Sequence, residues 1–377
     1  MSGERIGGGV RRVGRVVEIT SLAHFDQLVE RGARRMEGWR LFDVDLHERT
    51  TTLLRLDPAG ALLLGCAISG PALDHLQRGG AVVFPDVPDV PLDAYRQGLY
   101  APAELFGRLA DGDGDYAGSL DARIYAWSQR PGGPPENAVA RALHDAAIEN
   151  ALDRSIHGQR LVGVMGGHAL VRGDAGYLAA AELGRRLTRS GFVVATGGGP
   201  GAMEAANLGA YLAAAADDAL PAAVAALAAV PSFRPSVRDW AAAAFEVRRR
   251  WPGGDGGVGV PTWFYGHEPP NAFADRIAKL VQNSVREATL LARCNAGIVF
   301  LPGAAGTVQE IFQDACENYY AETPLIAPMV LVGERHWTED LPAWPLLRAL
   351  AAERPMARQV ALVEDPLDAL AHLTIEG

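Results

Sequence analysis

Residues 295–320 read NAGIVFLPGAAGTVQEIFQDACENYY, and they predict a buried strand, a glycine turn and the start of a helix. The apolar run 297–301 is the strand, and the turn 302–306 follows it. Apolar residues then recur at helical spacing, namely Val308, Ile311, Phe312 and Ala315. Gly303 and Gly306 let the backbone approach a ligand closely, and we expect Thr307 to cap the helix with its hydroxyl beside free N–H groups. Such a helix start attracts phosphate.

Glu310 lies one turn into this predicted helix. There its carboxylate would face whatever the phosphate is attached to. An acid near a helix start also complements the helix dipole without any other role. Motifs elsewhere in the chain have to decide between these interpretations.

Length, net charge and cysteine content limit the kinds of protein that this chain can be. A chain of 377 residues predicts two domains, and 49% hydrophobic with 21% charged residues is ordinary for a globular protein. The net charge of −10 argues against a nucleic-acid polymer as partner. Cys66, Cys294 and Cys316 are widely spaced and odd in number, which predicts neither a disulfide framework nor a metal knot. We expect a reduced, cytoplasmic protein.

No membrane segment is expected either. The N-terminal residues MSGERIGGGVRRVGR are not followed by the apolar core of a signal peptide. The longest uncharged apolar stretch, 219–233, is shorter than a membrane span and is interrupted by Pro221 and Pro231.

The first part of the chain predicts a small α+β unit. Its expected elements are a helix at 21–35 and strands at 16–19, 39–45, 51–56, 62–67 and 79–85. Asp43, Asp45 and His47 alternate with apolar residues, which is typical of a solvated strand face, and we predict no metal site. Residues 1–155, including a linker helix at 137–157, are taken as an accessory domain with a hypothetical role in regulation or oligomer formation.

Residues 156–377 alternate between strands and helices. The expected strands are 161–165, 192–196, 262–265, 297–301, 329–332 and 360–363, and the expected helices are 176–190, 200–215, 272–293, 306–319 and 341–353. This alternation predicts a Rossmann-like, doubly wound parallel α/β sheet that binds ligands beyond the carboxyl ends of its strands. The insertion 216–260, with Arg248 to Arg250 near its end, is expected to be a lid or an exposed helical flap.

Three glycine turns follow three of these strands. They contain Gly166, Gly167 and His168, then Gly197–Met203, and then the 302–307 turn. One such turn is weak evidence for a ligand site, but three at one sheet edge are much stronger. Neither the dinucleotide fingerprint GxGxxG with its acidic partner nor GxxxxGK[ST] occurs. The pattern favours a nucleoside monophosphate or a similar compact phosphate ester.

Three ordered motifs, GGGPGAMEAAN (197–207), NSVREATLL (283–291) and PGAAGTVQE (302–310), resemble the LOG (LONELY GUY) family, once labelled "lysine decarboxylase". The resemblance covers residues 160–332, about half of the chain. It implies a phosphoribohydrolase that cleaves nucleoside 5′-monophosphates to free base and ribose 5-phosphate, and it implies a homo-oligomer, dimeric or larger. No cofactor is implied.

The resemblance also assigns roles to single residues. It implies that Glu310 and Arg286 are catalytic. The residues matching the glycine turns are Gly303, Gly306, Thr307, Gly198, Gly199, Gly201 and Met203. Two departures stand out, because Ala304 replaces a family glycine and the interval from Arg286 to Pro302 is one residue longer than in short members.

The chemistry fits these roles. Cleavage of an N-glycosidic bond passes through an oxocarbenium-like state that a carboxylate such as Glu310 can stabilise. A guanidinium holds phosphate bidentately, which suits Arg286, although a simple helix pair with Glu287 is the alternative for that residue.

Other candidates carry weaker signals. Asn283 lies one turn before Arg286 and is expected to face the same way, while His168 either meets the ligand or caps its loop. Glu204 either binds ribose or complements a helix dipole. The segment WFYGHEPPN (263–271) offers His267, Glu268 and aromatic side chains, which either stack on a base or belong to the core.

Two rival functions remain. Amino-acid decarboxylation with pyridoxal phosphate needs a Schiff-base lysine, and Lys279 is expected on a solvated helix face. We therefore reject that function. The second rival is a non-catalytic nucleotide- or cofactor-binding carrier or sensor on the same fold, which would need only the glycine turns.

Overall fold

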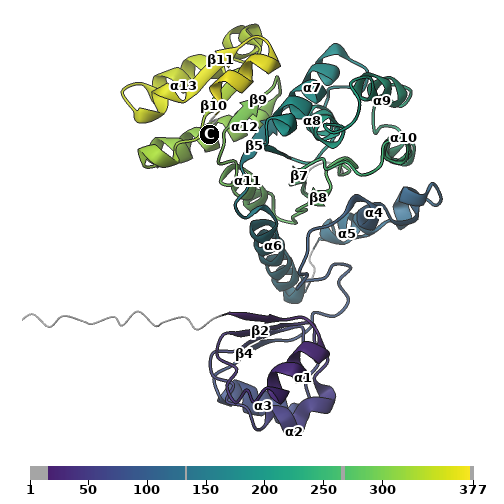
Figure 1. Cartoon of the computed structure of the whole chain (residues 1–377), viewed down its shortest axis with the longest axis vertical. Coiled ribbons are helices and arrows are strands. Elements are labelled where there is room, and N and C mark those ends of the chain that lie inside the picture. Colours follow the sequence, from purple (N-terminus) through teal and green to yellow (C-terminus); the bar gives the residue numbers. More distant parts are fainter. Residues whose placement is uncertain (1–15, 132–133, 265–267, 374–377) are drawn as a thin grey trace, which may run out of the picture. The chain divides into compact units, whose positions relative to one another are not determined.

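The computed structural model describes residues 16–131, 134–264 and 268–373 and forms two compact units (Figure 1). The smaller unit contains the described residues up to Gln97 together with Pro135–His144. The larger unit contains Gly98–Pro134 and the chain from Asp145 onward. The sequence places a boundary near residue 155, whereas residues 98–134 group with the larger unit. The regulatory or oligomerising role of the first part of the chain stays a prediction.

The smaller unit is built on a four-stranded sheet in the order β1-β2-β3-β4, and all of its strand pairs are parallel. Its elements are β1 (Val17–Ile19), α1 (Leu22–Glu30), β2 (Trp39–Phe42), α2 (Thr50–Leu53), β3 (Leu62–Leu64), α3 (Gly70–Arg78) and β4 (Val82–Phe84). The mixed α+β arrangement expected here is therefore a parallel α/β layer. The predicted strand 51–56 is wrong, because Leu53 and Leu56 are buried at a three-residue interval that suits helix α2 and the turn after it.

The larger unit contains a seven-stranded parallel sheet in the order β11-β10-β9-β5-β6-β7-β8. Its strands are β5 (Leu161–Met165), β6 (Val193–Thr196), β7 (Val258–Gly259), β8 (Arg276–Ile277), β9 (Ile298–Phe300), β10 (Met329–Val332) and β11 (Val360–Val363). Its helices are α4 (Pro102–Phe106), α5 (Leu120–Ser128), α7 (Ala175–Arg189), α8 (Ala202–Tyr211), α9 (Ala219–Leu227), α10 (Val237–Arg250), α11 (Asn283–Leu291), α12 (Ala305–Tyr320) and α13 (Ala343–Ala351). Helix α6 (Pro135–Ile156) connects the two units. The doubly wound α/β sheet is confirmed.

The strand order reverses beside β5. From β5 the chain runs outward through β6, β7 and β8, and it then returns to the other side of β5 to add β9, β10 and β11. Right-handed crossovers therefore place α7 and α8 on one face of the sheet and α12 and α13 on the other. In sheets of this kind ligands bind at the carboxyl ends of the strands next to the reversal. Those ends carry the glycine turns that follow β5, β6 and β9.

Two predicted elements between residues 258 and 293 are wrong. The strand expected at 262–265 lies earlier, at β7, and the helix expected at 272–293 begins only at α11, with strand β8 before it. Residues 277–281 are buried without a break. Continuous burial is typical of an interior strand, whereas a surface helix exposes one face.

Lys279 does not lie on a solvated face. It is 1% exposed, and its Nζ lies 2.6 Å from Oδ1 of Asp121 on α5. The Asp121 carboxylate also accepts hydrogen bonds from Trp263 Nε1 (2.8 Å) and from the Tyr116 hydroxyl (2.5 Å). Burial lowers the pKa of Lys279, and Asp121 opposes that shift. This buried cluster attaches residues 98–134 to the sheet of the larger unit.

The insertion 216–260 is neither a loose flap nor an addition outside the sheet. It forms α9 and α10 and supplies strand β7. Leu227 and Trp240 are 0% and 1% exposed. Of the three arginines near its end, Arg248 pairs with Asp275 (2.6 Å) and stacks on Tyr211. In the part of the chain that the structure describes, no helix is long and apolar enough to cross a bilayer.

Helices α7 and α8 lie side by side and contact each other through glycines (Figure 1). A Cβ on Gly209 of α8 would lie 1.7 Å from the carbonyl oxygen of Ala181 on α7, and one on Gly184 would lie 2.1 Å from that of Ala206. We expect Gly209→Ala to destabilise the larger unit by about 3 kcal/mol, since a backbone contact cannot relax as a side chain does. Urea unfolding measures this. Gly70→Ala is the control, because its Cβ would meet nothing within 4 Å, and equal losses for both variants would contradict the prediction.

Candidate functional site

A cavity of about 1070 Å3 opens at the carboxyl ends of the central strands. Its lining residues come from the three glycine turns, from α11 and α12, and from the segments after β10 and β11. Among the predicted site residues it is lined by Gly166, Gly167, His168, Gly199, Met203, Asn283, Arg286, Gly303, Gly306, Thr307 and Glu310. The tertiary structure thus brings most of the predicted site together around one cavity, which we call the main cavity.

Hydrogen bonds connect the three glycine turns. Gly167 N donates to Pro302 O (3.1 Å), and Ala202 N donates to Gly167 O (3.2 Å). Gly201 has φ +73°, and a Cβ there would lie 2.5 Å from Gly167 O. Gly167 therefore joins the turn after β9 to the turn after β6, and these contacts fix the floor of the main cavity.

The turn after β9 leads directly into helix α12. The helix begins at Ala305 with Ala304 as its N-cap, so Thr307 lies inside the first turn and does not cap it. Thr307 is instead buried against Gly303, where a Cβ would lie 2.1 Å from Thr307 Oγ1. Ala304 adopts φ −121°, which a residue with a side chain tolerates. The first N–H groups of α12 have no partner within the helix and point to the cavity end of α12, as a phosphate site requires.

Two glycines of the second turn lie differently from the prediction. Gly198 has φ +70° and packs against Pro261 and Gly259, so its backbone shapes the turn without lining the main cavity. Gly201 lines a smaller neighbouring pocket. Gly197 takes the place of Gly198 in the lining, and a Cβ there would lie 2.3 Å from Arg286 Nη2.

Arg286 joins the second turn to helix α12. Its Nη1 lies 3.3 Å from Glu310 Oε1 and 2.5 Å from Glu287 Oε2, and its Nε donates to Val260 O at 2.9 Å. The helix pair with Glu287 and the proximity to Glu310 therefore both occur. Burial acts to lower the pKa of Arg286, but the two carboxylates outweigh it and the pKa is raised. The guanidinium stays charged, and these contacts hold it between the turn after β6 and helix α12.

Glu310 is 6% exposed and lines the main cavity one turn into α12. Burial raises the pKa of its carboxyl, Arg286 lowers it, and the Glu287 carboxylate raises it again, with a net increase. A carboxyl whose pKa is raised toward neutrality can exchange a proton with a ligand near pH 7. Its place in the lining of the main cavity, in contact with Arg286, distinguishes Glu310 from an acid that only complements the helix dipole.

Asp314, one turn further along α12, predicts a pH dependence of stability. Burial, with a smaller contribution from Glu317, raises its pKa to about 8. Between about pH 4 and pH 8 the folded chain holds a proton that the unfolded chain has released, so stability falls as pH rises. We expect Asp314→Asn to gain a few kcal/mol over the wild type at pH 8 relative to pH 5. Urea unfolding at both pH values measures this, and exposed Asp218→Asn, the control, should change nothing. An unchanged pH slope in Asp314→Asn would contradict the assignment.

Of the weaker candidates, some line the main cavity and others do not. His168 Nδ1 pairs with Glu268 Oε1 at 3.2 Å, and both residues line the main cavity. Trp263 is 2% exposed and belongs to the core, and Glu204 forms a buried bidentate pair with Arg172 (2.5 and 3.0 Å). Tyr265 and His267 lie outside the described residues.

Some lining residues were not predicted from the sequence. His336, after β10, has its Nε2 3.0 Å from Gly303 O and lines the main cavity, as do Glu287 and Glu364. Their position in the chain could have indicated them, because the segments that follow the strands of a parallel sheet reach the same edge of that sheet. In the described part of the chain, no group of three or more His, Cys, Asp and Glu side chains is arranged to hold a metal ion.

Comparison with known proteins finds likeness at the level of structure. No family model matches the chain, and no curated protein matches it. The molybdenum cofactor binding protein of Rippkaea orientalis is 18% identical with a TM-score of 0.36, and the match covers 57% of this chain and 95% of that one. The molybdenum cofactor carrier protein of Chlamydomonas reinhardtii is 19% identical with a TM-score of 0.36, covering 56% and 94%. A second structure of the carrier protein from that alga is 20% identical with a TM-score of 0.33, with the same coverage. The likeness concerns the fold alone.

Proposed function

We propose that the larger unit binds a nucleotide or a similar phosphate-bearing small molecule in the main cavity. The phosphate would lie at the start of α12, against Gly303, Gly306 and the first N–H groups of the helix. Backbone N–H groups and the helix dipole both favour an anion there. A bound phosphate at this position would have Glu310 within one helical turn of the group it is attached to.

We further propose that the chain hydrolyses the N-glycosidic bond of nucleoside 5′-monophosphates, the activity implied by the resemblance to the LOG family. The observation that carries this proposal is the contact between Arg286 and Glu310 at 3.3 Å inside the main cavity. A site that only held a phosphate would need the glycine turns and a cation. It would not need a buried carboxyl whose pKa is raised.

The reaction can be written for these residues. As the bond between C1′ and the base nitrogen breaks, its electron pair goes to that nitrogen, which takes up a proton. Water forms the new bond to C1′ and gives a proton to Glu310, which returns a proton to the departing base nitrogen, so that atoms and charge balance. The Glu310 carboxylate stabilises the positive charge that develops on the ribose, and Arg286 holds Glu310 in place or exchanges it for the substrate phosphate.

A non-catalytic carrier or sensor is the second candidate. The size of the main cavity favours it, since about 1070 Å3 exceeds what a mononucleotide fills and suits a larger cofactor. Arg286 is also already neutralised by two carboxylates, which weakens its hold on a phosphate. A carrier is the class of role named for the structural neighbours, whose likeness to this chain is one of fold.

One assay separates the two functions. The full chain is incubated with AMP, GMP, IMP, CMP, UMP and an N6-prenylated AMP, and free base and ribose 5-phosphate are quantified. Release of both products in equal amounts supports hydrolysis and ranks the bases. Binding of nucleotides by calorimetry without any release supports the carrier. The same preparations, run through size-exclusion chromatography with light scattering, test the predicted homo-oligomer.

A further inference from the structure

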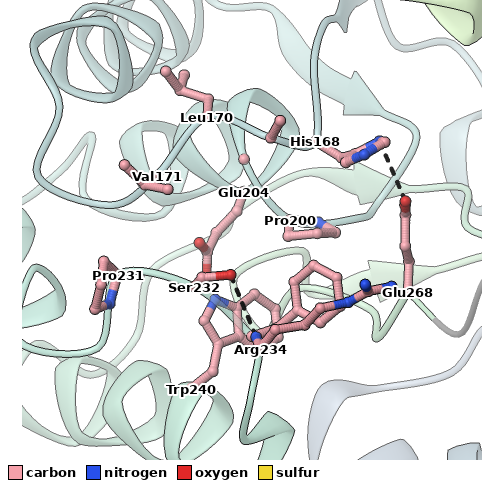
Figure 2. Close-up of a pocket in the computed structure, with 13 residues that line it drawn as sticks. His168, Leu170, Val171, Pro200, Glu204, Pro231, Ser232, Arg234, Trp240 and Glu268 are labelled. Atoms are coloured by element: carbon pink, nitrogen blue, oxygen red, sulfur yellow. Dashed lines mark hydrogen bonds and ion pairs between the residues drawn. The ribbon is translucent and has the colours of Figure 1, made fainter.

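A smaller pocket of about 240 Å3 lies beside the main cavity (Figure 2). We call it the side pocket. Its walls come from the loop after β5, the turn after β6, the segment 231–234 of the insertion and helix α10. His168, Ala169, Leu170 and Glu268 line both spaces, so the two are neighbours. At about 240 Å3 the side pocket suits a single ring system and not a whole nucleotide.

A buried ion pair builds the floor of the side pocket. Both carboxylate oxygens of Glu204 accept hydrogen bonds from Arg172, which also donates to the carbonyl oxygens of Val230 and Trp240. Arg172 and Glu204 are each 1% exposed in their side chains, and the Arg172 guanidinium lies 4.7 Å from the Trp240 ring centroid. The charge of Glu204 is therefore satisfied within the protein, and its role is to hold the wall in place.

Glu268 is the carboxylate that a ligand can reach. Its side chain is 31% exposed, and its Oε1 is paired with His168. Its Oε2 lies 3.4 Å from the position that a Cβ on Gly199 would occupy, directly above the turn after β6. Figure 2 shows the Glu268 and His168 side chains meeting on one side of the side pocket, away from Glu204. Apolar walls stand nearby, with Phe233 and Trp240 in edge contact at 6.4 Å.

The distances between elements fit one extended ligand. Strands β9 and β6 flank β5, so the turns that follow them are separated by about 10 Å, or two strand spacings. Arg286 and Glu310 lie between those turns. A nucleotide with its phosphate at α12 therefore places its ribose at Glu310 and directs its base toward Gly199, Glu268 and the side pocket.

We propose that the side pocket holds the heterocyclic base of the ligand and that Glu268 selects bases with an amino group. A carboxylate accepts two adjacent N–H donors in a bidentate manner. The ring N–H and the neighbouring 2-amino group of a guanine-type edge present such a pair. This inference rests on the proposed binding of a nucleotide and names its class: a phosphate ester of a 2-amino-oxo heterocycle.

Equilibrium binding tests the inference independently of hydrolysis. GMP and IMP differ only in the 2-amino group, and titration calorimetry measures the affinity of the full chain for each, with ribose 5-phosphate as the ligand that lacks a base. We expect GMP to bind about 10- to 100-fold more tightly than IMP, the value of a hydrogen bond to a charged group. Glu268→Gln should reduce that ratio to about threefold or less and leave the affinity for ribose 5-phosphate unchanged.

A second variant tests the location of the base. Ser232 lines the side pocket only, and Ser232→Trp should fill it, weakening GMP binding at least tenfold while ribose 5-phosphate still binds. Ala229→Trp, exposed two residues before the segment 231–234 and outside both linings, is the matched control. GMP affinity that is unaffected by Ser232→Trp would overturn the assignment of the base to the side pocket.

The outcomes separate this inference from the proposed function. If ribose 5-phosphate binds but GMP and IMP bind equally, the base assignment is wrong and the phosphate site stands. If GMP binds more tightly than IMP through Glu268 but releases no base, the assignment stands and hydrolysis is wrong. If none of the three ligands binds, both are wrong.

Discussion

Glu310→Gln is expected to reduce the release of base from nucleoside monophosphates by a factor of about 100 to 1000. The amide keeps the shape of the side chain and its contact with Arg286, but it neither accepts a proton from water nor stabilises positive charge on the ribose. Nucleotide affinity should change far less, because the phosphate contacts at Gly303 and Gly306 remain. The measurement is the rate of base release at saturating substrate, together with calorimetry on the same protein.

Glu317→Gln is the matched control for that variant. Glu317 lies on the same helix, two turns further on, and does not line the main cavity. We expect it to keep wild-type activity. Loss of activity in both variants would point to a general effect on α12. Full activity of Glu310→Gln would remove Glu310 from the chemistry.

Asp121→Asn is expected to destabilise the larger unit by about 3–5 kcal/mol. The substitution removes the carboxylate paired with Lys279, which is buried beneath Trp263, and removing one partner of a buried ion pair has a cost of this order. The amide oxygen still accepts a hydrogen bond from Trp263, so the loss comes mainly from the charge. Chemical denaturation followed by tryptophan fluorescence measures the change.

The double variant Asp121→Asn with Lys279→Met provides the decisive comparison. It removes both charges at similar volume, so we expect its stability within about 1 kcal/mol of the wild type. Asp74→Asn, which breaks the exposed pair with Arg78, should cost less than about 1 kcal/mol. A double variant as unstable as Asp121→Asn alone would show that packing around the pair matters more than its charge.

The fold of the larger unit follows from local sequence to a large degree. The strands β5, β6, β9, β10 and β11 were predicted because each is a short apolar run followed by a glycine turn or a loop. The glycine turns can be predicted from the sequence because close contacts and positive φ values require glycine there, as at Gly201. Parallel pairing then brings the turns to one edge, and most of the predicted site lies there.

Sequence patterns failed where burial comes from distant segments. The run 272–281 resembles a helix locally, but all of it except Asp275 and Arg276 is buried, and it contains β8. A lysine in a polar-looking local sequence suggests a solvated residue. The partner of Lys279, Asp121, lies more than 150 positions away, in a segment that the sequence pattern assigned to the accessory domain but that belongs to the larger unit. No local pattern records such a pairing, because both the cost of burial and its compensation arise only in the folded chain.

The sequence by itself determined the parallel sheet, the three glycine turns and the residue types at the candidate site. Only the tertiary structure decided that Arg286 contacts both Glu287 and Glu310, that Glu204 is held by Arg172, and that Glu268 faces a second pocket. The physical reason is the range of the interactions involved. Backbone conformation and apolar periodicity act over a few residues, whereas ion pairs and pockets depend on side chains that approach through space.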